Sequence, residues 1–330
     1  MPDSVERTGS QEELFVSPDV NVAREFFRTK PRAMTNKLMS VSEAVRRFVH
    51  DGDYFASGGF GGVRISTAVL HEIVRQRKKN LGFSGHTATH DFQILAAGKC
   101  FDRCDIAYIV GLEMRGLSSN ARRVMESGAV KVTEWTNATL DWRYKAAAMG
   151  VPFLHARSAL GTDVFKHSAA KEITCPFTGQ KLLAVPALYP DVSVVHVHRA
   201  DVYGNCQVDG IAIADYDVAR ASKHLIVTTE HLVSTDEIRK DPLRTLAPYW
   251  MVDAVCHVRY GGYPGNMPYE YYSDEEHLAE WIEAEKDEAT LAAFLSKYIY
   301  GTKNFEEYLA LKGGEKRIAE LVALEPLKRG

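Results

Sequence analysis

The sequence predicts an α/β fold: a doubly wound, mostly parallel sheet with helices on both faces, followed by a C-terminal helical tail. Two patterns predict this class. Short apolar stretches typical of strands alternate with stretches of helical periodicity between residues 40 and 260, and only helical patterns follow residue 273. Strands that alternate with helices pair in parallel, because each crossover returns the chain to the same edge of the sheet.

The first predicted unit is a helix, a strand, a turn and a second helix. Ser40 and Glu43 form a capping box, and apolar residues then recur at helical spacing. A short strand is predicted over 54–57, and a glycine-rich turn connects it to a helix over 68–77. The functional analysis depends most on this unit, because a turn between a strand and a helix is a common ligand site.

The alternation then continues along the chain. Further strands are predicted over 106–110, 130–135, 192–198, 225–229 and 252–260. Helices are predicted over 118–128, 138–149, 216–223, 274–300, 304–311 and 315–324. We therefore expect three parts: an N-terminal extension, 1–38, that wraps the body of the protein or a partner; an α/β domain, 39–272; and a C-terminal helical segment, 273–330.

The composition excludes several classes of protein. The 330 residues include 40 basic and 43 acidic side chains, so no basic field attracts nucleic acid or an anionic membrane. No apolar run approaches the roughly 18 residues that a membrane span needs, and the polar N-terminus does not resemble a signal peptide. Five scattered cysteines predict reduced thiols rather than disulfides. We therefore expect a cytoplasmic protein with no metal, no nucleic-acid partner and no membrane partner.

The glycine turn, Gly58-Gly59-Phe60-Gly61-Gly62, is the first candidate binding site. Glycine permits close approach of a ligand to the backbone, and N–H groups at a strand-to-helix turn favour an anion or a developing oxyanion. The spacing fits neither the dinucleotide fingerprint G-x-G-x-x-G nor a P-loop. The alternative is a tight turn that binds no ligand, and composition alone leaves the two equally open.

Residues 51–60, Asp-Gly-x-x-Phe-Ala-Ser-Gly-Gly-Phe, resemble the first signature of the class I, glutamate-dependent coenzyme A transferases, alpha subunit. The sequence departs from that signature at Ser57, which is apolar in the family, and at 64–66, where Arg-Ile-Ser replaces Gly-x-Pro. An arginine at this point is similar to the alpha subunit of glutaconate CoA-transferase. The resemblance continues in chain order to residue 272, through motifs that include 137–140 and 215–219.

This resemblance implies the alpha half of a heteromeric enzyme that moves CoA between an acyl-CoA and a carboxylic acid, including dicarboxylic acids. In the family a glutamate carboxylate attacks the thioester, which divides one difficult exchange into easier steps. That glutamate belongs to the beta subunit in two-subunit members. The resemblance therefore implies a beta-subunit partner in a heterotetramer or larger assembly. It implies no cofactor, because the CoA thioester is a substrate.

Two other functions stay open at this point. One is a diverted family member that hydrolyses, ring-opens or decarboxylates a CoA thioester. The other is a non-catalytic sensor of acyl-CoA. The sequence of the partner beta subunit distinguishes a diverted family member from a transferase, because transfer requires an intact glutamate motif in that subunit.

Two glutamates of this chain compete with a partner's glutamate as the nucleophile. Glu126 is followed by Ser-Gly, as in a family nucleophile motif, but it lies at a predicted helix end, where a solvated carboxylate with a glycine cap is expected. Glu113 follows the predicted strand 106–110, where parallel sheets place ligands; otherwise it forms a loop salt bridge with Arg115 or Arg122. We keep Glu113 as the in-chain candidate and expect the nucleophile to come from another chain.

Asn137 is the second catalytic candidate, because the resemblance places it where the family has an active-site amide. Such an amide can donate to the thioester oxyanion. The alternative is that Asn137 caps a helix that starts at Ala138. Thr139, in the same motif, is a candidate for substrate or CoA binding.

Arg64, Ser84 and His86 complete the predicted site. Arg64 either pairs with a substrate carboxylate through both guanidinium nitrogens or is a surface charge at a helix start. Ser84 and His86 lie at and just beyond a predicted strand end and either contact substrate or belong to a plain polar loop. The predicted substrate- or CoA-binding residues are Gly58, Gly59, Phe60, Gly61, Arg64, Ser84, His86 and Thr139.

Overall fold

A computed structural model describes residues 13–109 and 116–328 of the chain. Its centre is a twisted sheet in which seven strands run parallel, in the order β12-β10-β8-β1-β2-β3-β4. These strands are β1 (Tyr54–Ser57), β2 (Leu81–Gly85), β3 (Phe101–Ile106), β4 (Lys131–Glu134), β8 (Val192–Ala200), β10 (His224–Leu232) and β12 (Ala254–His257). Two short antiparallel strands, β9 (Cys206–Gln207) and β11 (Thr245–Ala247), extend it beside the end of β8. The predicted fold class is confirmed.

The strand order reverses at β1. The chain builds outward through β2, β3 and β4, and then returns to place β8 on the other side of β1. In open α/β sheets the connections diverge at such a point and leave a crevice beyond the carboxyl ends of the two strands, where ligands bind. The glycine turn follows β1 directly and therefore lies at this position.

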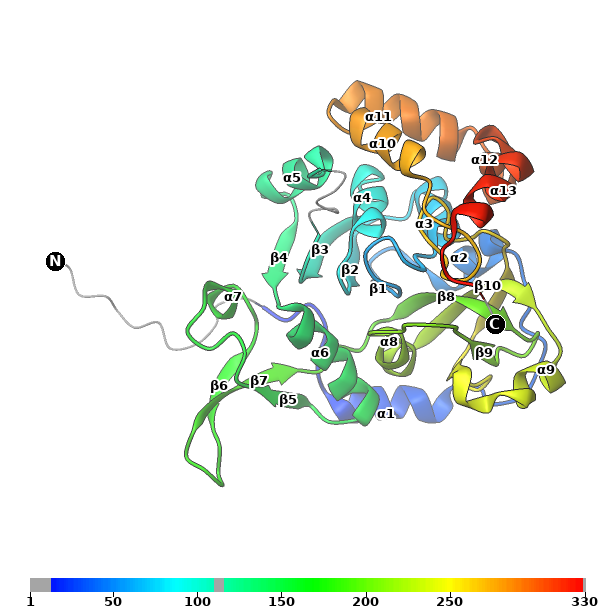
Figure 1. The fold of residues 1–330 in the computed structure, drawn as a ribbon. Helices are drawn as coiled ribbons and strands as arrows, with labels where there is room; N and C mark the ends of the chain where they lie inside the picture. Colours follow the sequence, from blue (N-terminus) through cyan, green and yellow to red (C-terminus); the bar gives the residue numbers. More distant parts are fainter. Residues whose placement is uncertain (1–12, 110–115, 329–330) are drawn as a thin grey trace.

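Helices cover both faces of the sheet (Figure 1). One face carries α2 (Val41–Phe48), α3 (Thr67–Arg75), α4 (His90–Ala97) and α5 (Ser119–Glu126), and the other carries α1 (Val20–Thr29), α6 (Asn137–Met149) and α8 (Asp215–Ala221). Successive residues of β1 serve opposite faces: Phe55 belongs to the first core, whereas Tyr54 and Ala56 belong to the second. The sheet is therefore buried on both sides, as its apolar strands predict.

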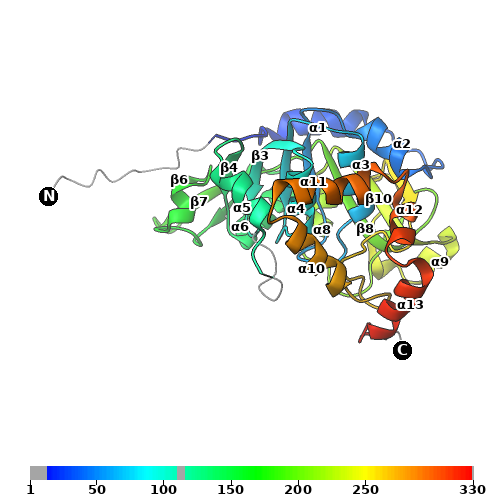
Figure 2. The same cartoon turned by 90° about the horizontal axis from the view of Figure 1, so that it is seen from above.

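The C-terminal helices are part of the first core. They are α10 (Glu275–Ala284), α11 (Glu288–Leu295), a π-helical turn (Ser296–Tyr300), α12 (Phe305–Leu311) and α13 (Gly314–Leu324). Figure 2 shows α10 and α11 over the face that carries α3 and α4. The prediction of one helix over 274–300 was wrong, because Asp287 starts a new helix by accepting from the N–H groups of Ala289 and Thr290.

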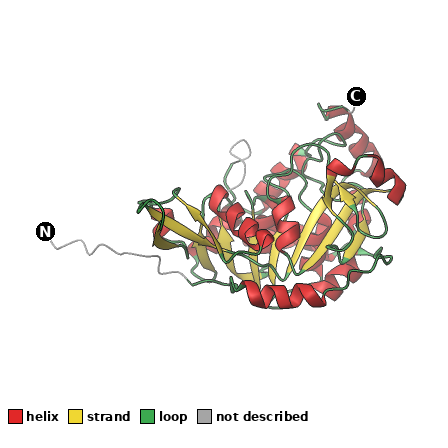
Figure 3. Ribbon diagram, turned by 90° about the horizontal axis from the view of Figure 1, so that it is seen from below, coloured by secondary structure: helices red, strands yellow, loops and turns green. Residues whose placement is uncertain are grey.

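Helices α4, α7 (Asp163–Lys166) and α9 (Thr235–Lys240) were not predicted, and neither were two further parts of the structure. Helix α1 lies within the N-terminal extension, and a small antiparallel sheet consists of β5 (Phe153–Ala156), β6 (Lys171–Thr174) and β7 (Lys181–Pro186). Figure 3 shows this sheet and the C-terminal helices at opposite ends of the molecule. Strand β6 is largely exposed and carries Lys171 and Glu172, and β5 is only four residues long and mostly not buried, so neither has the long apolar stretch that signals a buried strand.

Most strand bounds also differ from the prediction, and those of β3 and β12 differ most. Strand β3 ends at Ile106 instead of starting there, and β12 ends at His257 rather than at 260. Charged residues, Asp102 and Arg103, interrupt the apolar pattern of β3 near its start. In the described ranges no helix is both long and apolar enough to cross a membrane.

Candidate active site

The glycine turn requires glycine because of its own backbone. Gly59 has φ +78°, and a Cβ there would lie 2.6 Å from the carbonyl oxygens of Val63 and Arg64. A Cβ at Gly58 would lie 2.9 Å from the carbonyl oxygen of Val194 on β8. Contacts below 3.0 Å to backbone cannot be relieved by a side-chain rotation, so the turn closes on itself and on the sheet.

The N–H groups of this turn are already engaged within the chain. The N–H of Gly58 donates to Val194 O at 2.8 Å, that of Phe60 to Val63 O at 3.1 Å, and that of Gly61 to Thr87 O at 2.8 Å. The N–H of Gly59 donates to the Oδ1 atom of Asp215 at 2.9 Å. These four groups are not a free cradle for an anion, contrary to the expectation from sequence. Substrate binding by Gly58, Gly59, Phe60 and Gly61 stays a prediction, and Phe60 alone of the four is partly exposed.

Arg64 is buried and bound to Asp215. Its Nη2 and Nη1 atoms lie 2.8 Å and 3.1 Å from the two carboxylate oxygens of Asp215, and Nη2 also donates to Ile211 O at 2.8 Å. The side chain is fully buried, so the alternative of a surface charge is wrong. Helix α3 begins only at Thr67, three residues later. In this structure Arg64 therefore binds a carboxylate of its own chain.

Asp215 joins the glycine turn to helix α8. Burial acts to raise its pKa, but the charge and hydrogen bonds of Arg64 and the N–H of Gly59 hold the pKa below its ordinary value. The carboxylate is therefore ionised at neutral pH and bonded to both ends of the turn. Sequence reasoning placed Asp215 in a family motif but gave it no role. The available signal was that Arg64 had been predicted to bind a carboxylate, without Asp215 being considered as that carboxylate.

The loop after β2 is fastened to the same turn. Thr89 donates through Oγ1 to Gly61 O at 2.6 Å, and the carboxylate of Asp91 accepts from Thr89 N at 2.8 Å and Phe92 N at 3.0 Å. Burial raises the pKa of Asp91 to about 6, against hydrogen bonds that include one from Ser57. The hydroxyl of Ser57, where the sequence departs from the family signature, is thus one of the groups that oppose the raised pKa of Asp91, and its Oγ donates to Gly58 O at 3.3 Å.

Ser84 and His86 are both brought to this edge but are largely enclosed. The Ser84 hydroxyl is fully buried and accepts from the Tyr144 hydroxyl of α6 at 2.6 Å. His86 is 8% exposed, and burial lowers its pKa, so the imidazole is neutral at pH 7. Contact of either side chain with substrate stays a prediction.

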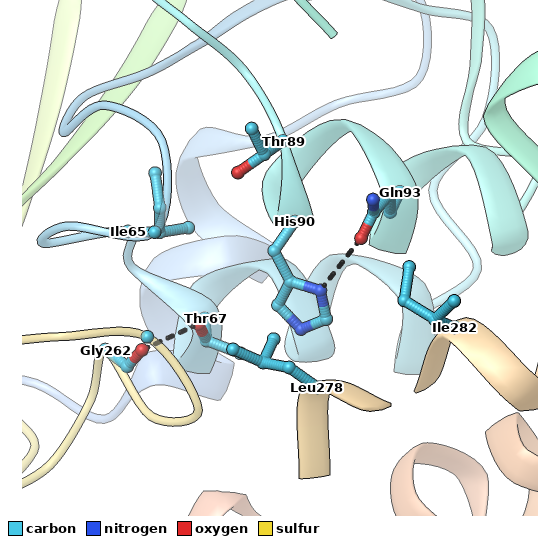
Figure 4. Close-up of a pocket in the computed structure, with 10 residues that line it drawn as sticks. Ile65, Thr67, Thr89, His90, Gln93, Gly262, Leu278 and Ile282 are labelled. Carbon is cyan, nitrogen blue, oxygen red and sulfur yellow. Dashed lines mark hydrogen bonds between the residues drawn. The ribbon is translucent and has the colours of Figure 1, made fainter. Parts of the chain in front are cut away.

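A small cavity lies behind the turn, between α3, α4 and α10 (Figure 4). Its volume is about 30 Å³, which accommodates one or two water molecules but no substrate. The lining residues include Thr67, Thr89, His90 and Gln93, and His90 Nδ1 lies 3.3 Å from Gln93 Oε1. His90 therefore faces this small cavity. Within residues 13–109 and 116–328, no three metal-binding side chains cluster together.

Asn137 is the first residue of α6 and does not cap it. The cap is Thr136, whose Oγ1 accepts from Thr139 N at 3.0 Å, while Thr139 Oγ1 accepts from Thr136 N at 2.9 Å. The helix-cap alternative for Asn137 is therefore wrong. Its side chain is exposed, and its amide makes no hydrogen bond within the described part of the chain. Thr139 is buried in the capping box, so its role in substrate binding stays a prediction.

A buried charge pair holds α6 in place. Arg143 and Trp135 both bond to Asp105 Oδ1, the tryptophan through Nε1 at 2.7 Å, and Arg143 is fully buried. Asp105 lies in β3 and Trp135 directly after β4. The start of α6, and with it Asn137, is therefore fixed at the carboxyl edge of the sheet.

Glu126 and Glu113 were the two glutamates of this chain considered as the nucleophile. Glu126 is exposed at the end of α5 and pairs with Arg122 at 2.9 Å, which confirms the solvated helix-end interpretation. Glu113 lies outside the described residues, so its candidacy stays a prediction.

Helices α6 and α8 bring two carboxyl groups together. Burial, followed by the charge of Asp217, raises the pKa of Asp141 to about 6, and its Oδ1 has no hydrogen-bond partner among the described residues. Because the folded-state pKa lies above the unfolded value of about 3.9, ionisation opposes folding as pH rises between these values. We expect Asp141→Asn to raise Tm at pH 8 and to change it little at pH 4.

The control for that prediction is Asp163→Asn. Asp163 is exposed, and a hydrogen bond and the charge of Lys166 lower its pKa, so its replacement should not stabilise the chain at pH 8. Thermal unfolding of the three proteins at both pH values checks the prediction. An Asp141→Asn protein less stable than wild type at pH 8 would contradict it.

The fold is that of a doubly wound α/β protein. The glycine turn and the first residue of α6, Asn137, both lie at the carboxyl edge of its sheet, where such proteins bind ligands. Residues 38–257 match the family described as coenzyme A transferase, so the chain belongs to the coenzyme A transferase family.

Similar proteins include an uncharacterized one and two named CoA-transferases. The chain is 50% identical over 312 residues to a protein of Archaeoglobus fulgidus, covering 94% of this chain and 70% of the relative. It is 36% identical over 278 residues to the alpha subunit of 3-oxoadipate CoA-transferase from Pseudomonas knackmussii, covering 83% of this chain and 97% of the relative. Among solved structures, glutaconate coenzyme A-transferase from Acidaminococcus fermentans matches with a TM-score of 0.82 at 29% identity, covering 86% of this chain and 95% of that chain. The chain is therefore an alpha subunit of this family.

Proposed function

We propose that this chain is the alpha subunit of a heteromeric enzyme that transfers CoA between an acyl-CoA and a carboxylic acid. The partner beta subunit supplies the glutamate nucleophile. The observation that carries the proposal is Asn137: an exposed amide without an internal partner in the described chain, at the N-terminus of a helix that starts at the ligand edge of the sheet. Such a group is suited to an oxyanion, because both the N–H donor and the helix N-terminus favour negative charge.

Each step of the transfer places negative charge on a carbonyl oxygen. The partner's glutamate oxygen attacks the thioester carbon, and the resulting oxyanion collapses to an anhydride as CoA leaves as a thiolate. The thiolate then attacks the glutamyl carbonyl, which forms the enzyme thioester and releases the first carboxylate. The acceptor carboxylate reverses these two steps. This chain contributes the Asn137 donor and a rigid rim around the reacting carbonyl, formed by the glycine turn with Asp215 and Arg64.

The acids of the named relatives guide the choice of substrate. 3-Oxoadipate and glutaconate are both dicarboxylic acids, which supports a dicarboxylic acid as one substrate. Arg64 supports this less than the sequence suggested, because both of its terminal nitrogens bind the carboxylate of Asp215. A heterotetramer or larger assembly is the corresponding proposal for the holoenzyme.

We expect the isolated chain to be inactive as a transferase, because the nucleophile belongs to the partner. The experiment assays the chain with acetyl-CoA and a panel of mono- and dicarboxylic acids, alone and together with the beta subunit. Turnover should require both polypeptides and should be lost when the partner's motif glutamate is replaced by glutamine. Turnover by the isolated chain that Glu113→Gln abolishes would contradict the proposal. Release of free CoA without an acceptor acid would favour hydrolysis instead.

A further inference from the structure

The loop after β12 returns to the glycine turn and pairs with it along the backbone. Asn266 N donates to Gly62 O at 2.7 Å, and Arg64 N donates to Asn266 O at 2.9 Å. A Cβ at Gly265 would lie 2.3 Å from Gly62 O, so the two backbones are in direct contact. The position of the second half of the turn therefore depends on Asn266.

Glu325 fixes Asn266 from the C-terminal end of the chain, which turns back after α13 (Figure 1). The Asn266 Nδ2 atom donates to Glu325 Oε2 and to Tyr271 O, both at 2.8 Å. The other oxygen of Glu325 accepts from Tyr269 N at 3.3 Å and from Leu327 N at 3.2 Å. One carboxylate thus holds two points of the loop.

A second connection from Glu325 reaches Arg64 from the opposite side. Glu325 accepts a hydrogen bond from the N–H of Tyr269. The ring of Tyr269 lies against Gly210, where an added Cβ would be 3.2 Å from the ring. The next residue, Ile211, accepts from Arg64 Nη2 at 2.8 Å. Both the backbone and the guanidinium of Arg64 are therefore supported by segments that contact the Glu325-bound loop.

Glu325 is a buried carboxylate residue. It is only 3% exposed, and no ion pair joins it to a basic side chain between residues 116 and 328 or in the described N-terminal part. A buried carboxylate that is stabilised only by N–H donors costs free energy unless its hydrogen bonds are well made. Its hydrogen bonds all go to the loop and to the following turn of the tail.

We propose that Glu325 is a positioning residue for the glycine turn. Through Asn266 and Tyr269 it holds Gly62 and Arg64 in the place that the transfer reaction requires. The expected effect of Glu325 on catalytic activity rests on the proposed function. Its expected effect on the structure of the glycine turn does not. The proposal gives the C-terminal tail a role in positioning the candidate active site, although this tail lies beyond residues 38–257, which match the family.

The first test measures hydrogen exchange of the isolated full chain by NMR. Glu325→Ala should speed exchange of the Arg64 amide, whose acceptor is Asn266 O, by about 10-fold, because the loop loses its anchor. Glu325→Gln keeps one acceptor for Asn266 and should restore most of the protection. Glu320→Ala is the matched control: Glu320 lies on the adjacent helix α13, is exposed and contacts Arg317. It should leave the Arg64 amide unchanged.

The second test measures turnover of the assembled enzyme. We expect Glu325→Ala to lower kcat/KM by about 10-fold for every acid tested, with Glu325→Gln intermediate and Glu320→Ala normal. If the Arg64 amide exchanges faster in Glu325→Ala but the wild-type enzyme shows no transferase activity, the proposed function is rejected and the positioning role is kept. Unchanged exchange at Arg64, or faster exchange only within α13, would overturn the positioning role, whatever the activity.

Discussion

Replacing Asp215 by asparagine is expected to lower the free energy of unfolding by about 3–5 kcal/mol, because it leaves the guanidinium of Arg64 buried without a counter-charge. Asparagine has the same shape and can still accept from the N–H of Gly59, so the loss measures the charge rather than packing. Urea unfolding at pH 7 gives this difference. Both Arg64 and Asp215 are fully buried, so solvent cannot replace the missing charge.

Asp217→Asn is the matched control on the same helix. Asp217 is partly exposed, and burial raises its pKa, so neutralising it should cost little. The double variant Arg64→Met with Asp215→Leu should recover a large part of the stability lost in Asp215→Asn, because no unpaired charge remains. A loss below about 1 kcal/mol in Asp215→Asn would show that this pair does not hold the turn.

Asn137→Ala in the assembled enzyme is expected to lower kcat by roughly 10- to 1000-fold with little change in Tm. The side chain is exposed and is not the helix cap, so its removal should not disturb α6. Asn137→Gln keeps the amide and should retain much of the activity. Asn137→Asp should be at least as impaired as the alanine variant, because a carboxylate repels the oxyanion.

Thr136→Ala separates the two roles that the sequence left open for this segment. It removes the hydroxyl that accepts from Thr139 N and should cost about 1 kcal/mol of stability. Its effect on kcat should be smaller than that of Asn137→Ala. If the two variants lose the same stability and the same activity, Asn137 supports the helix and does not act on the substrate.

The sequence predicted the elements whose signals are local. Ser40 caps α2 by accepting from Glu43 N at 3.1 Å, although the described residues show no reciprocal bond from the Glu43 side chain, and Gly150 ends α6 in the left-handed region at φ 69°. These features need only neighbouring residues, so a pattern of a few letters identifies them. The glycine turn belongs to the same class, since its position after β1 was predicted correctly.

The partners of the candidate site residues were not predictable in the same way. Arg64 meets Asp215 across 151 positions of sequence, and Asn266 meets Glu325 across 59. A single chain gives no signal for such pairs beyond the presence of the charges. The expectation of free N–H groups in the turn was wrong, because three of them donate to backbone carbonyls and that of Gly59 donates to the side chain of Asp215. The surface alternative for Arg64 was also wrong, because Asp215 arrives from a distant element to bind it.

The shared core of the C-terminal helices limits how this chain can be recombined with its relatives. Trp281 of α10 packs against His90 with ring centroids 5.0 Å apart, and Tyr308 of α12 packs against His71 at 4.6 Å. The end of the family match at residue 257 is therefore not a boundary of folding. A chimaera that exchanged everything after this point would place foreign aromatic rings against α3 and α4. Such an exchange should succeed only if the facing surfaces of those two helices are exchanged with it.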